Sequence, residues 1–522
     1  MKHRLALLLM GVLACCVLTA CNPSVVDLPP VAPDQPWRPS QADMDSNAAV
    51  SDKPADNKTE SSAPAEEKPS SSAPKFELPS GLSVSYRRDE VSVDVSHTFN
   101  LAELIDLAEQ NNPDTRIAWE QSKQAAYGVG LAKATYLPEI SAEVLGGVEH
   151  TPLPMPKNLV PKGYSVSNTE EVIPALVIKW LLFDFGKRDS EVEARKKASL
   201  ASNIAFTGTH QKLIFEVSKA YFALDAERAQ LHVAEDAVKS SRTLQDAAVT
   251  KGKNGLGTVT ETSTAKRGLA QAEFDLAKAR AVDNDAYHAL LEAIGLTPTL
   301  KLQIADSSGR ALPQKLAGDT DAYIKKALAQ RPDIAAAYAK VQGSEAEISG
   351  AEASYYPTLG LEGTVNQNVG WLSIDGSSAY HVNDPAAAIL LRLKLPLYDG
   401  GVRENNLSLA RSKNAEAKEE LVKAQDEAIR QVAKAYDTVK AALAEYNAAM
   451  ALVKASNTAN AAALDAYKHG VGTFTDAVTS ETQRSQAQSA KAHAYATVLT
   501  AAAALAFSTG DLTSIDALNN RP

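Results

Sequence analysis

Cysteine is nearly absent from this chain of 522 residues, and it occurs at one end only. All three cysteines, Cys15, Cys16 and Cys21, fall within the first 21 residues. The remainder therefore has no disulfide, no thiolate zinc site and no cysteine nucleophile. The nine histidines occur singly, without the HExxH pattern of zinc peptidases. These absences exclude much of metal and thiol enzymology.

Aromatic residues and positive charge are also scarce. Phe, Trp and Tyr make up 6% of the chain, and the 45% that is hydrophobic leans heavily on alanine. Alanine suits helices whose backbones approach one another closely. The formal net charge is −10. Proteins that bind nucleic acid usually carry a basic surface, so the charge argues against that class. No Walker motif is present, so the chain has no P-loop for binding and hydrolysing a nucleoside triphosphate.

Asp184-Phe185-Gly186 spells the metal-binding motif of protein kinases, but the rest of a kinase is missing. No glycine-rich loop, strand lysine or HRD segment accompanies it. We interpret the motif and its later copy as strand-to-helix turns, in which aspartate caps and glycine takes unusual backbone angles. The turn residues are Asp184, Gly186, Asp399 and Gly401. The sequence predicts no catalytic constellation, cofactor or metal site.

The N-terminus has the form of a secretory signal. A basic start precedes an apolar run from Leu5 to Leu18, which is too short to span a membrane. Leu18-Thr19-Ala20-Cys21 is similar to the lipobox of bacterial lipoproteins, which predicts a signal peptide over 1–20 and acylation of Cys21. An ordinary signal peptide containing a cysteine is the alternative. Residues 21–96 are rich in Pro, Ser and Ala and predict a disordered tether.

The rest of the chain consists of two copies of one sequence repeat. Five motifs recur in the same order, which chance would not preserve. The pairs are NNPD at 111–114 with QRPD at 330–333, YLP at 136–138 with YYP at 355–357, FDFGKR at 183–188 with YDGGVR at 398–403, KAY at 219–221 with KAY at 434–436, and GLGT at 255–258 with GVGT at 470–473.

Each unit predicts the same elements. Asn100 and Glu103 have the form of a capping box, and Pro113 opens an alanine-rich helix. The expected strands are 140–148, 172–183, 359–369 and 388–398, and the expected long helices run from 187 to about 250 and from 403 to about 469. The expected domains are a first repeat over 97–300 with a β-hairpin at 139–184, a linker over 301–319, a second repeat over 320–511 with a β-hairpin at 358–398, and a tail over 512–522.

The four strands predict a barrel that one chain cannot close. Their lengths and partial alternation fit tilted membrane strands, although soluble hairpins would look similar. A membrane barrel needs at least about eight strands, and lipid tolerates no open edge. If the strands enter a membrane, several chains must share one barrel. The expected fold class is therefore mainly α with membrane β: a duplicated helix-hairpin unit with a coiled-coil part and a transmembrane β-barrel.

This arrangement resembles the TolC-like outer-membrane efflux family, in its lipoprotein branch, over residues 97–511. The resemblance implies a homotrimer in which three chains give a twelve-stranded barrel in outer-membrane lipid and a twelve-helix periplasmic tunnel. It also implies two partners, a periplasmic adaptor protein and an inner-membrane pump. The implied location is the outer membrane, lipid-anchored and extending into the periplasm.

The resemblance places the Gly-x-Gly-Thr turns at the periplasmic entrance, against the adaptor. These residues are Gly255, Gly257, Thr258, Gly470, Gly472 and Thr473. A purely structural turn is the alternative. Some members carry a basic residue at the position of Phe474 and an acidic one at Val478, so their gate is not carried over intact.

Glu481 and Asp476 are the candidate gate carboxylates. They lie five residues apart and therefore do not stack on one helical face. In a trimer, one lumenal carboxylate becomes a ring of three that favours cations. Solvated charges on a helix face are the alternative for both.

The leading function is a passive export duct for small molecules. One alternative is the outlet of a type I protein secretion system. Another is a non-transporting structural lipoprotein that spans the periplasm as a coiled coil. The paired strands argue against this last alternative, because a rod needs none.

Overall fold

The structure is a computed structural model that describes residues 32–35, 96–255, 257–307, 312–313, 316 and 318–512. The expected signal peptide, Cys21, most of the tether and all but the first residue of the tail lie outside the described residues. The chain divides into a larger unit, Met1–Trp37 with Asn100–Pro298 and Asp306–Pro522, and a smaller unit, Arg38–Phe99 with Thr299–Ala305. In the smaller unit, β1 (Thr98–Phe99) and β4 (Gln303–Ile304) pair in parallel.

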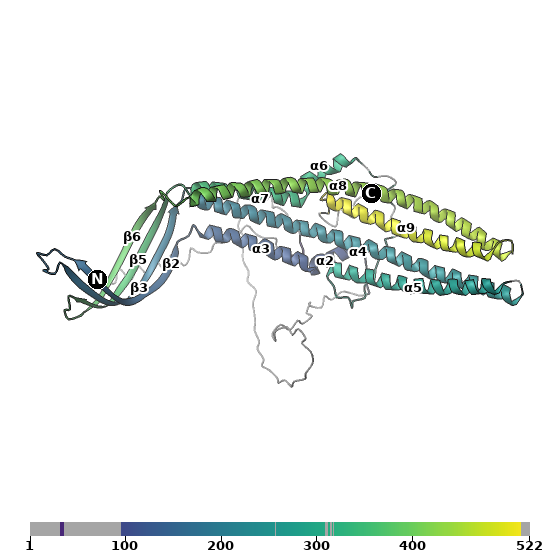
Figure 1. The fold of residues 1–522 in the computed structure, drawn as a ribbon, viewed down its shortest axis with the longest axis horizontal. Helices are drawn as coiled ribbons and strands as arrows, with labels where there is room; N and C mark the ends of the chain where they lie inside the picture. Colours follow the sequence, from purple (N-terminus) through teal and green to yellow (C-terminus); the bar gives the residue numbers. More distant parts are fainter. Residues whose placement is uncertain are drawn as a thin grey trace, which may run out of the picture. The chain divides into compact units, whose positions relative to one another are not determined.

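The helices of the larger unit repeat almost residue for residue. The first repeat has helices of 11, 22, 67 and 36 residues: α2 (Leu101–Asn111), α3 (Pro113–Ala134), α4 (Lys187–Lys253) and α5 (Val259–Ile294). The second has helices of 11, 22, 67 and 35 residues: α6 (Thr320–Gln330), α7 (Pro332–Ala353), α8 (Val402–Lys468) and α9 (Phe474–Ser508). Figure 1 shows the two sets in sequence colours. The duplicated unit expected from the motifs is confirmed.

Local chemistry explains where these helices begin. Asn100 and Glu103 form the expected capping box at α2, with both reciprocal hydrogen bonds present. Asn112 caps α3, and Pro113 occupies its first turn, where a missing N–H does no harm. Thr258 and Glu261 form a second capping box at α5. Both α4 and α8 are 67 residues long, which corresponds to about 100 Å at 1.5 Å per residue.

The helices pack through small side chains, and α4 joins the two repeats. It contacts α3 and α5 of its own repeat and α7 and α9 of the other, while α8 packs against α6, α7 and α9. Buried alanines line these contacts, such as Ala126, Ala339, Ala428 and Ala501. Because alanine adds little bulk, the helix axes lie close enough for interlocking side chains.

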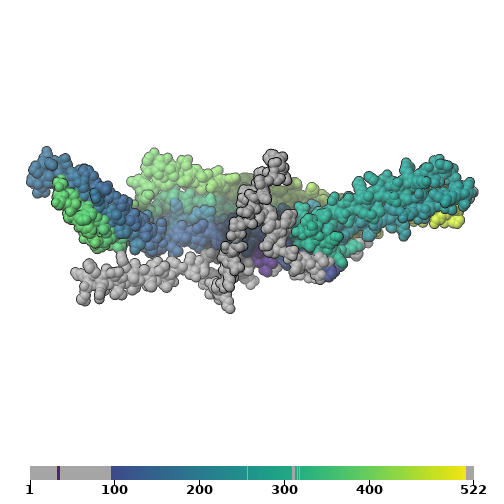
Figure 2. All heavy atoms as spheres, turned by 90° about the horizontal axis from the view of Figure 1, so that it is seen from below, coloured from purple at the N-terminus to yellow at the C-terminus, as the bar shows by residue number. Residues whose placement is uncertain are grey.

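Four strands form one antiparallel sheet in the order β2-β3-β5-β6. They are β2 (Glu139–Pro154), β3 (Tyr164–Phe183), β5 (Thr358–Ile374) and β6 (Tyr380–Lys394). The β3–β5 pairing joins the hairpins of the two repeats, and β2 and β6 are the outer strands. Figure 2 shows the strand segments in blue and green at one end of the larger unit and α5 in teal toward the other.

The strands differ from the expected ranges in length. They have 16, 20, 17 and 15 residues. Strands β2, β3 and β6 extend into polar stretches that hydropathy alone assigns to loops, and β5 continues to Ile374. Strand β6 ends at Lys394 rather than at 398, because Pro396 has no N–H for a ladder. Within the described part of the chain, no helix is long and apolar enough to cross a membrane.

Candidate functional site

The two faces of the four-stranded sheet differ in chemistry. Residues directly opposite in neighbouring strands share a face, so the pairing sorts every side chain. Ile140, Ile178, Gly363 and Ile389 form one row, whereas Glu139, Lys179, Glu362 and Leu390 form the next row on the other face. Every Asp, Glu, Lys and Arg of the four strands except Glu170 lies on this second face. We call the two sides the apolar face and the polar face.

The apolar face is left open by the residues that the structure describes. Val144 is 73% exposed and Ile389 80% exposed. Exposed aliphatic side chains over a whole sheet face mark a surface that meets lipid or another molecule. A polar face behind it is the pattern of a membrane strand that lines a water-filled interior.

Each sheet-to-helix turn is held by an aspartate and an arginine. Asp184 accepts hydrogen bonds from the Arg188 backbone N–H at 3.1 Å and from its Nε at 2.9 Å. Asp399 repeats both bonds with Arg403, at 3.2 and 2.7 Å. The hydrogen bond from Arg403 holds the pKa of Asp399 below its usual range.

Glycine completes each turn. Gly186 has a φ of +90° and Gly401 a φ of +87°, a left-handed conformation that glycine adopts without strain. The turn motifs predicted roles for the aspartates and glycines but none for the arginines. The available signal was the Asp-x-x-x-Arg spacing, which occurs in both repeats.

A tyrosine packs under each of these arginines. The guanidinium of Arg188 lies 4.6 Å from the Tyr136 ring centre, and that of Arg403 lies 5.2 Å from the Tyr355 ring. This geometry permits cation–π attraction. Burial, followed by the hydrogen bond to Asp189, raises the pKa of Tyr136 to about 12. The YLP and YYP motifs thus lie beside the turns of their own repeats.

The helical hairpins end in turns that leave almost no room for a side chain. A Cβ on Gly257 would lie 2.9 Å from the backbone nitrogen of Gly252, and one on Gly472 would lie 2.9 Å from the Cβ of Ala466. Gly255 and Gly470 have φ values of +72° and +77°. Thr258 and Thr473 cap the helices that follow. Backbone geometry therefore demands these glycines, whatever they contact.

The tips of the two hairpins pack against one another. Leu244 and Ala248 of α4 form one buried cluster with Tyr467 of α8 and Phe474 of α9. Lys251 lies 3.9 Å from the centre of the Tyr467 ring and donates to that residue's carbonyl at 2.7 Å. The tips of both repeats thus form one packed end.

Glu481 is buried and paired within the chain. Its carboxylate accepts two bonds from Arg484, at 2.7 and 3.0 Å, and one from Asn460 of α8 at 2.7 Å. The hydrogen bond to Glu481 raises the pKa of Arg484. Asp476 is exposed, and its backbone N–H bonds to the Thr473 hydroxyl. The gate role of either carboxylate stays a prediction, but Glu481 is not a solvated surface charge in the single chain.

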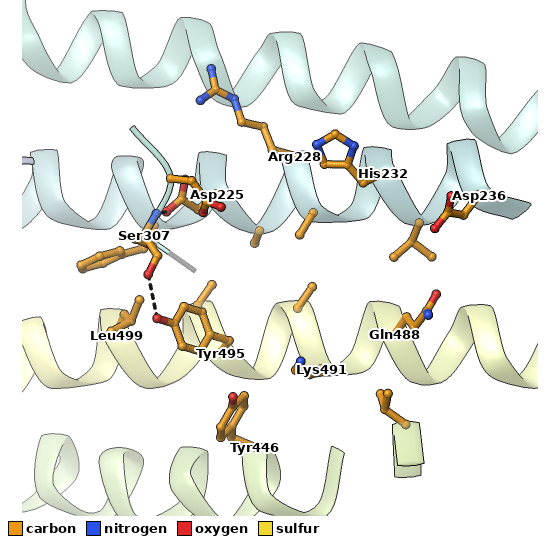
Figure 3. A pocket seen from close by; sticks show the side chains of 18 of the residues that line it. Asp225, Arg228, His232, Asp236, Ser307, Tyr446, Gln488, Lys491, Tyr495 and Leu499 are labelled. Atoms are coloured by element: carbon orange, nitrogen blue, oxygen red, sulfur yellow. Dashed lines mark hydrogen bonds between the residues drawn. The ribbon is translucent and has the colours of Figure 1, made fainter. Parts of the chain in front are cut away.

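A cavity of about 650 Å³ lies between α4, α8 and α9 (Figure 3). Asp225 of α4 accepts the Ser307 backbone N–H at 3.0 Å, and the Tyr495 hydroxyl of α9 donates to the Ser307 carbonyl at 2.8 Å. Ser307 thereby bridges the two repeats. Burial raises the pKa of Asp225, and it also raises that of Tyr221 to about 12. The described residues include no group of three His, Cys, Asp or Glu that could hold a metal ion.

Comparison with known families defines the class of protein. The model of the outer membrane efflux protein family matches residues 104–296 and 323–511, which are the two repeats. The chain belongs to this family. It is an outer-membrane efflux channel protein with the TolC-like fold, and not an enzyme, as the sequence motifs predicted.

Individual relatives agree with this assignment. CyaE of Bordetella pertussis is 25% identical over 67% of this chain and 71% of its own length. The cation efflux system protein CusC of Escherichia coli O157:H7 is 26% identical over 59% of this chain and 63% of its own, which is less than two thirds. The outer membrane protein VceC of Vibrio cholerae has the same fold, with a TM-score of 0.64, 21% identity, and coverage of 78% of this chain and 96% of its own.

Proposed function

We propose that three copies of this chain form the outer-membrane duct of a tripartite export system. The duct is passive and receives small molecules from an inner-membrane pump through a periplasmic adaptor protein. The observation that carries this proposal is the two-faced sheet joined directly to two helices of 67 residues. Its outer strands, β2 and β6, each pair with one neighbour only among the described strands.

The trimer follows from strand number and edge chemistry. Four strands cannot close a barrel, and the outer edges of β2 and β6 present backbone groups that lipid cannot satisfy. Pairing β6 of one copy with β2 of the next satisfies both edges. Three copies reach a strand number within the range of known outer-membrane barrels, with the apolar face toward lipid.

The helices carry the duct away from the membrane. At about 100 Å, α4 and α8 place the hairpin tips far from the sheet. We assign the tips to the adaptor, because both repeats present a turn at the same end. Val471 in the second turn is 83% exposed and offers an apolar contact beside Gly470 and Gly472.

Lipidation of Cys21 is a separate part of the proposal. The thiol would carry the acyl chain after removal of residues 1–20, and residues 21–96 would tether it to the first repeat. Labelled palmitate should enter the wild-type protein but not Cys21→Ser, while trimers still form because the barrel supplies its own anchorage. Label in Cys21→Ser would disprove the lipobox.

The assembly test uses protein extracted from membranes. Light scattering should give three times the mass of the mature chain, which is the 55.4 kDa of the full sequence less residues 1–20, and the trimer should conduct in planar bilayers. A monomeric, non-conducting product would instead favour the structural lipoprotein.

A deletion strain separates the two kinds of cargo. Increased sensitivity to drugs or metal ions supports small-molecule efflux, whereas loss of one polypeptide from the medium supports type I secretion. CusC is named for cation efflux and another relative, MdtQ, as a putative multidrug resistance protein. We therefore propose the cargo as a small molecule without a narrower class.

A further inference from the structure

Every lysine and arginine of the sheet lies at one end of its polar face. They are Lys179 in β3 and Arg392 and Lys394 in β6, within the last rows before the helices. Farther from the helices, the charged residues of this face are all acidic: Glu143, Glu149, Glu171 and Asp384. Glu139 and Glu362 lie in the same rows as the basic residues, so the net charge changes from +1 at the helix end of the face to −4 farther from the helices. We call Lys179, Arg392 and Lys394 the basic collar.

The three members of the basic collar differ in how far they are neutralised. Arg392 forms an ion pair with Glu362, at 2.7 Å between Nη2 and Oε2. Lys179 lies directly opposite Glu139 on one side and Glu362 on the other. Lys394 lies opposite Thr358 and makes no ion pair with any residue that the structure describes. It is therefore the least compensated charge of the three.

A cavity of about 560 Å³ opens beside the basic collar. All three basic residues line it, and Leu131, Leu137 and Leu181 form apolar parts of its wall. Gly360 lies opposite Arg392, and its missing side chain leaves space in the sheet face. Glu139 and Glu362 also line the cavity, so its three basic and two acidic side chains leave one net positive charge. The cavity thus combines an apolar wall with a net positive charge, which suits a molecule with an apolar body and an anionic group.

We propose that the basic collar is a transit site for organic anions bearing a sulfonate, phosphate or carboxylate group. This inference rests on the proposed trimer, in which the polar face lines the lumen and three copies of the collar form a ring. An anion that leaves the helical tunnel must pass this ring before it meets the acidic stretch beyond it. A lipid headgroup would carry the same anionic chemistry, but lipid meets the apolar face.

The test is block of single-channel current by 8-hydroxypyrene-1,3,6-trisulfonate, an aromatic trisulfonate, added to the wild-type trimer. Lys394→Gln should raise the concentration that halves the current roughly five- to tenfold, since each trimer loses three charges that attract the probe. Lys394→Arg should retain the wild-type block. Glu143→Gln changes a residue on the same face but outside the collar. In this variant the concentration that halves the current should fall or stay unchanged. All effects should shrink in about 1 M salt, where the Debye length falls to roughly 3 Å.

The outcomes separate this inference from the proposed function. If the wild-type trimer does not conduct, the channel itself is wrong. If it conducts but Lys394→Gln is blocked as readily as wild type, the collar is not a transit site. The transit site is also disproved if the trisulfonate has no effect while the current changes on replacing anionic lipid by phosphatidylcholine, since the collar would then hold lipid.

Discussion

At the scale of single residues, the tip glycines are constrained by the backbones around them. Gly257→Ala and Gly472→Ala should each cost about 1–3 kcal/mol of stability, because the new Cβ forces a helix end to shift. Val471→Ala should leave the fold intact and reduce export if the tip docks an adaptor. Thermal unfolding measured beside an efflux assay distinguishes the two effects.

One result would contradict the structural role given to the tip glycines. A Gly472→Ala protein that melts like wild type and still fails to export would make the glycine itself an adaptor contact. The sequence alone left docking and structural roles open, because spacing does not reveal the distance from Gly472 to Ala466.

The ionisation of Asp225 should make the stability of the fold depend on pH. Burial raises its pKa above the ordinary 3.8, so ionising the carboxyl weakens the fold as pH rises from about 3.8 through the raised value. Asp225→Asn cannot ionise and still offers an oxygen to the Ser307 N–H. The melting temperature of the variant should exceed that of wild type at pH 7. This difference should shrink as the pH falls below about 4, where the carboxyl of Asp225 is protonated. A difference in melting temperature of equal size at every pH in this range would mean that ionisation of Asp225 does not destabilise the fold.

At the scale of elements, the two turns should differ in their dependence on arginine. The Asp184–Arg188 side chains are 6% and 10% exposed, against 25% and 16% for Asp399–Arg403. Arg188→Met leaves a buried aspartate unpaired and should cost about 3–5 kcal/mol. Arg403→Met should cost less, because water reaches Asp399 more easily.

The readout for the turns is the temperature at which the detergent-extracted trimer dissociates. Arg195→Met is the matched control, since Arg195 and its partner Glu191 are more than half exposed and such pairs contribute roughly 0–1 kcal/mol. Equal losses for Arg188→Met and Arg403→Met would show that burial does not set the strength of these turns.

Element by element, the sequence predicted helices better than strands. The long helices lack proline and nearly lack glycine, and their ends carry caps that are legible in the chain, such as Asn100 and Thr258. The strands extend into polar segments near His150 and Asn383, where alternation fades. The collar required the β3–β5 register, which joins residues far apart in sequence and has no local signature.

Glu481 shows the corresponding limit at the candidate gate. Its position near the second turn was visible in the chain, and so was Arg484 three residues later. The second partner of Glu481, Asn460, lies on the neighbouring helix. Only the packing of α8 against α9 brings Asn460 within hydrogen-bond distance.

At the scale of the whole molecule, the two faces of the sheet predict opposite responses in adjacent residues. Ile389→Arg places a charge on the apolar face and should cost about 2–4 kcal/mol per chain if the residue lies near the bilayer midplane. Ala388→Arg places the same charge on the polar face and should cost little. The amount of trimer recovered from outer membranes measures the difference. Equal recovery would contradict a lipid-facing apolar face.

The identical lengths of α4 and α8 also restrict which insertions and deletions the chain can tolerate. A seven-residue insertion in α4 alone would push one hairpin tip about 10 Å beyond the other and break the shared cluster around Tyr467 and Phe474. Such an insertion would survive only with a matching one in α8 and in the shorter helices beside both. Insertions and deletions in the helices of such duplicated chains should therefore occur as matched sets in all helices that lie side by side, while loops between strands vary one at a time.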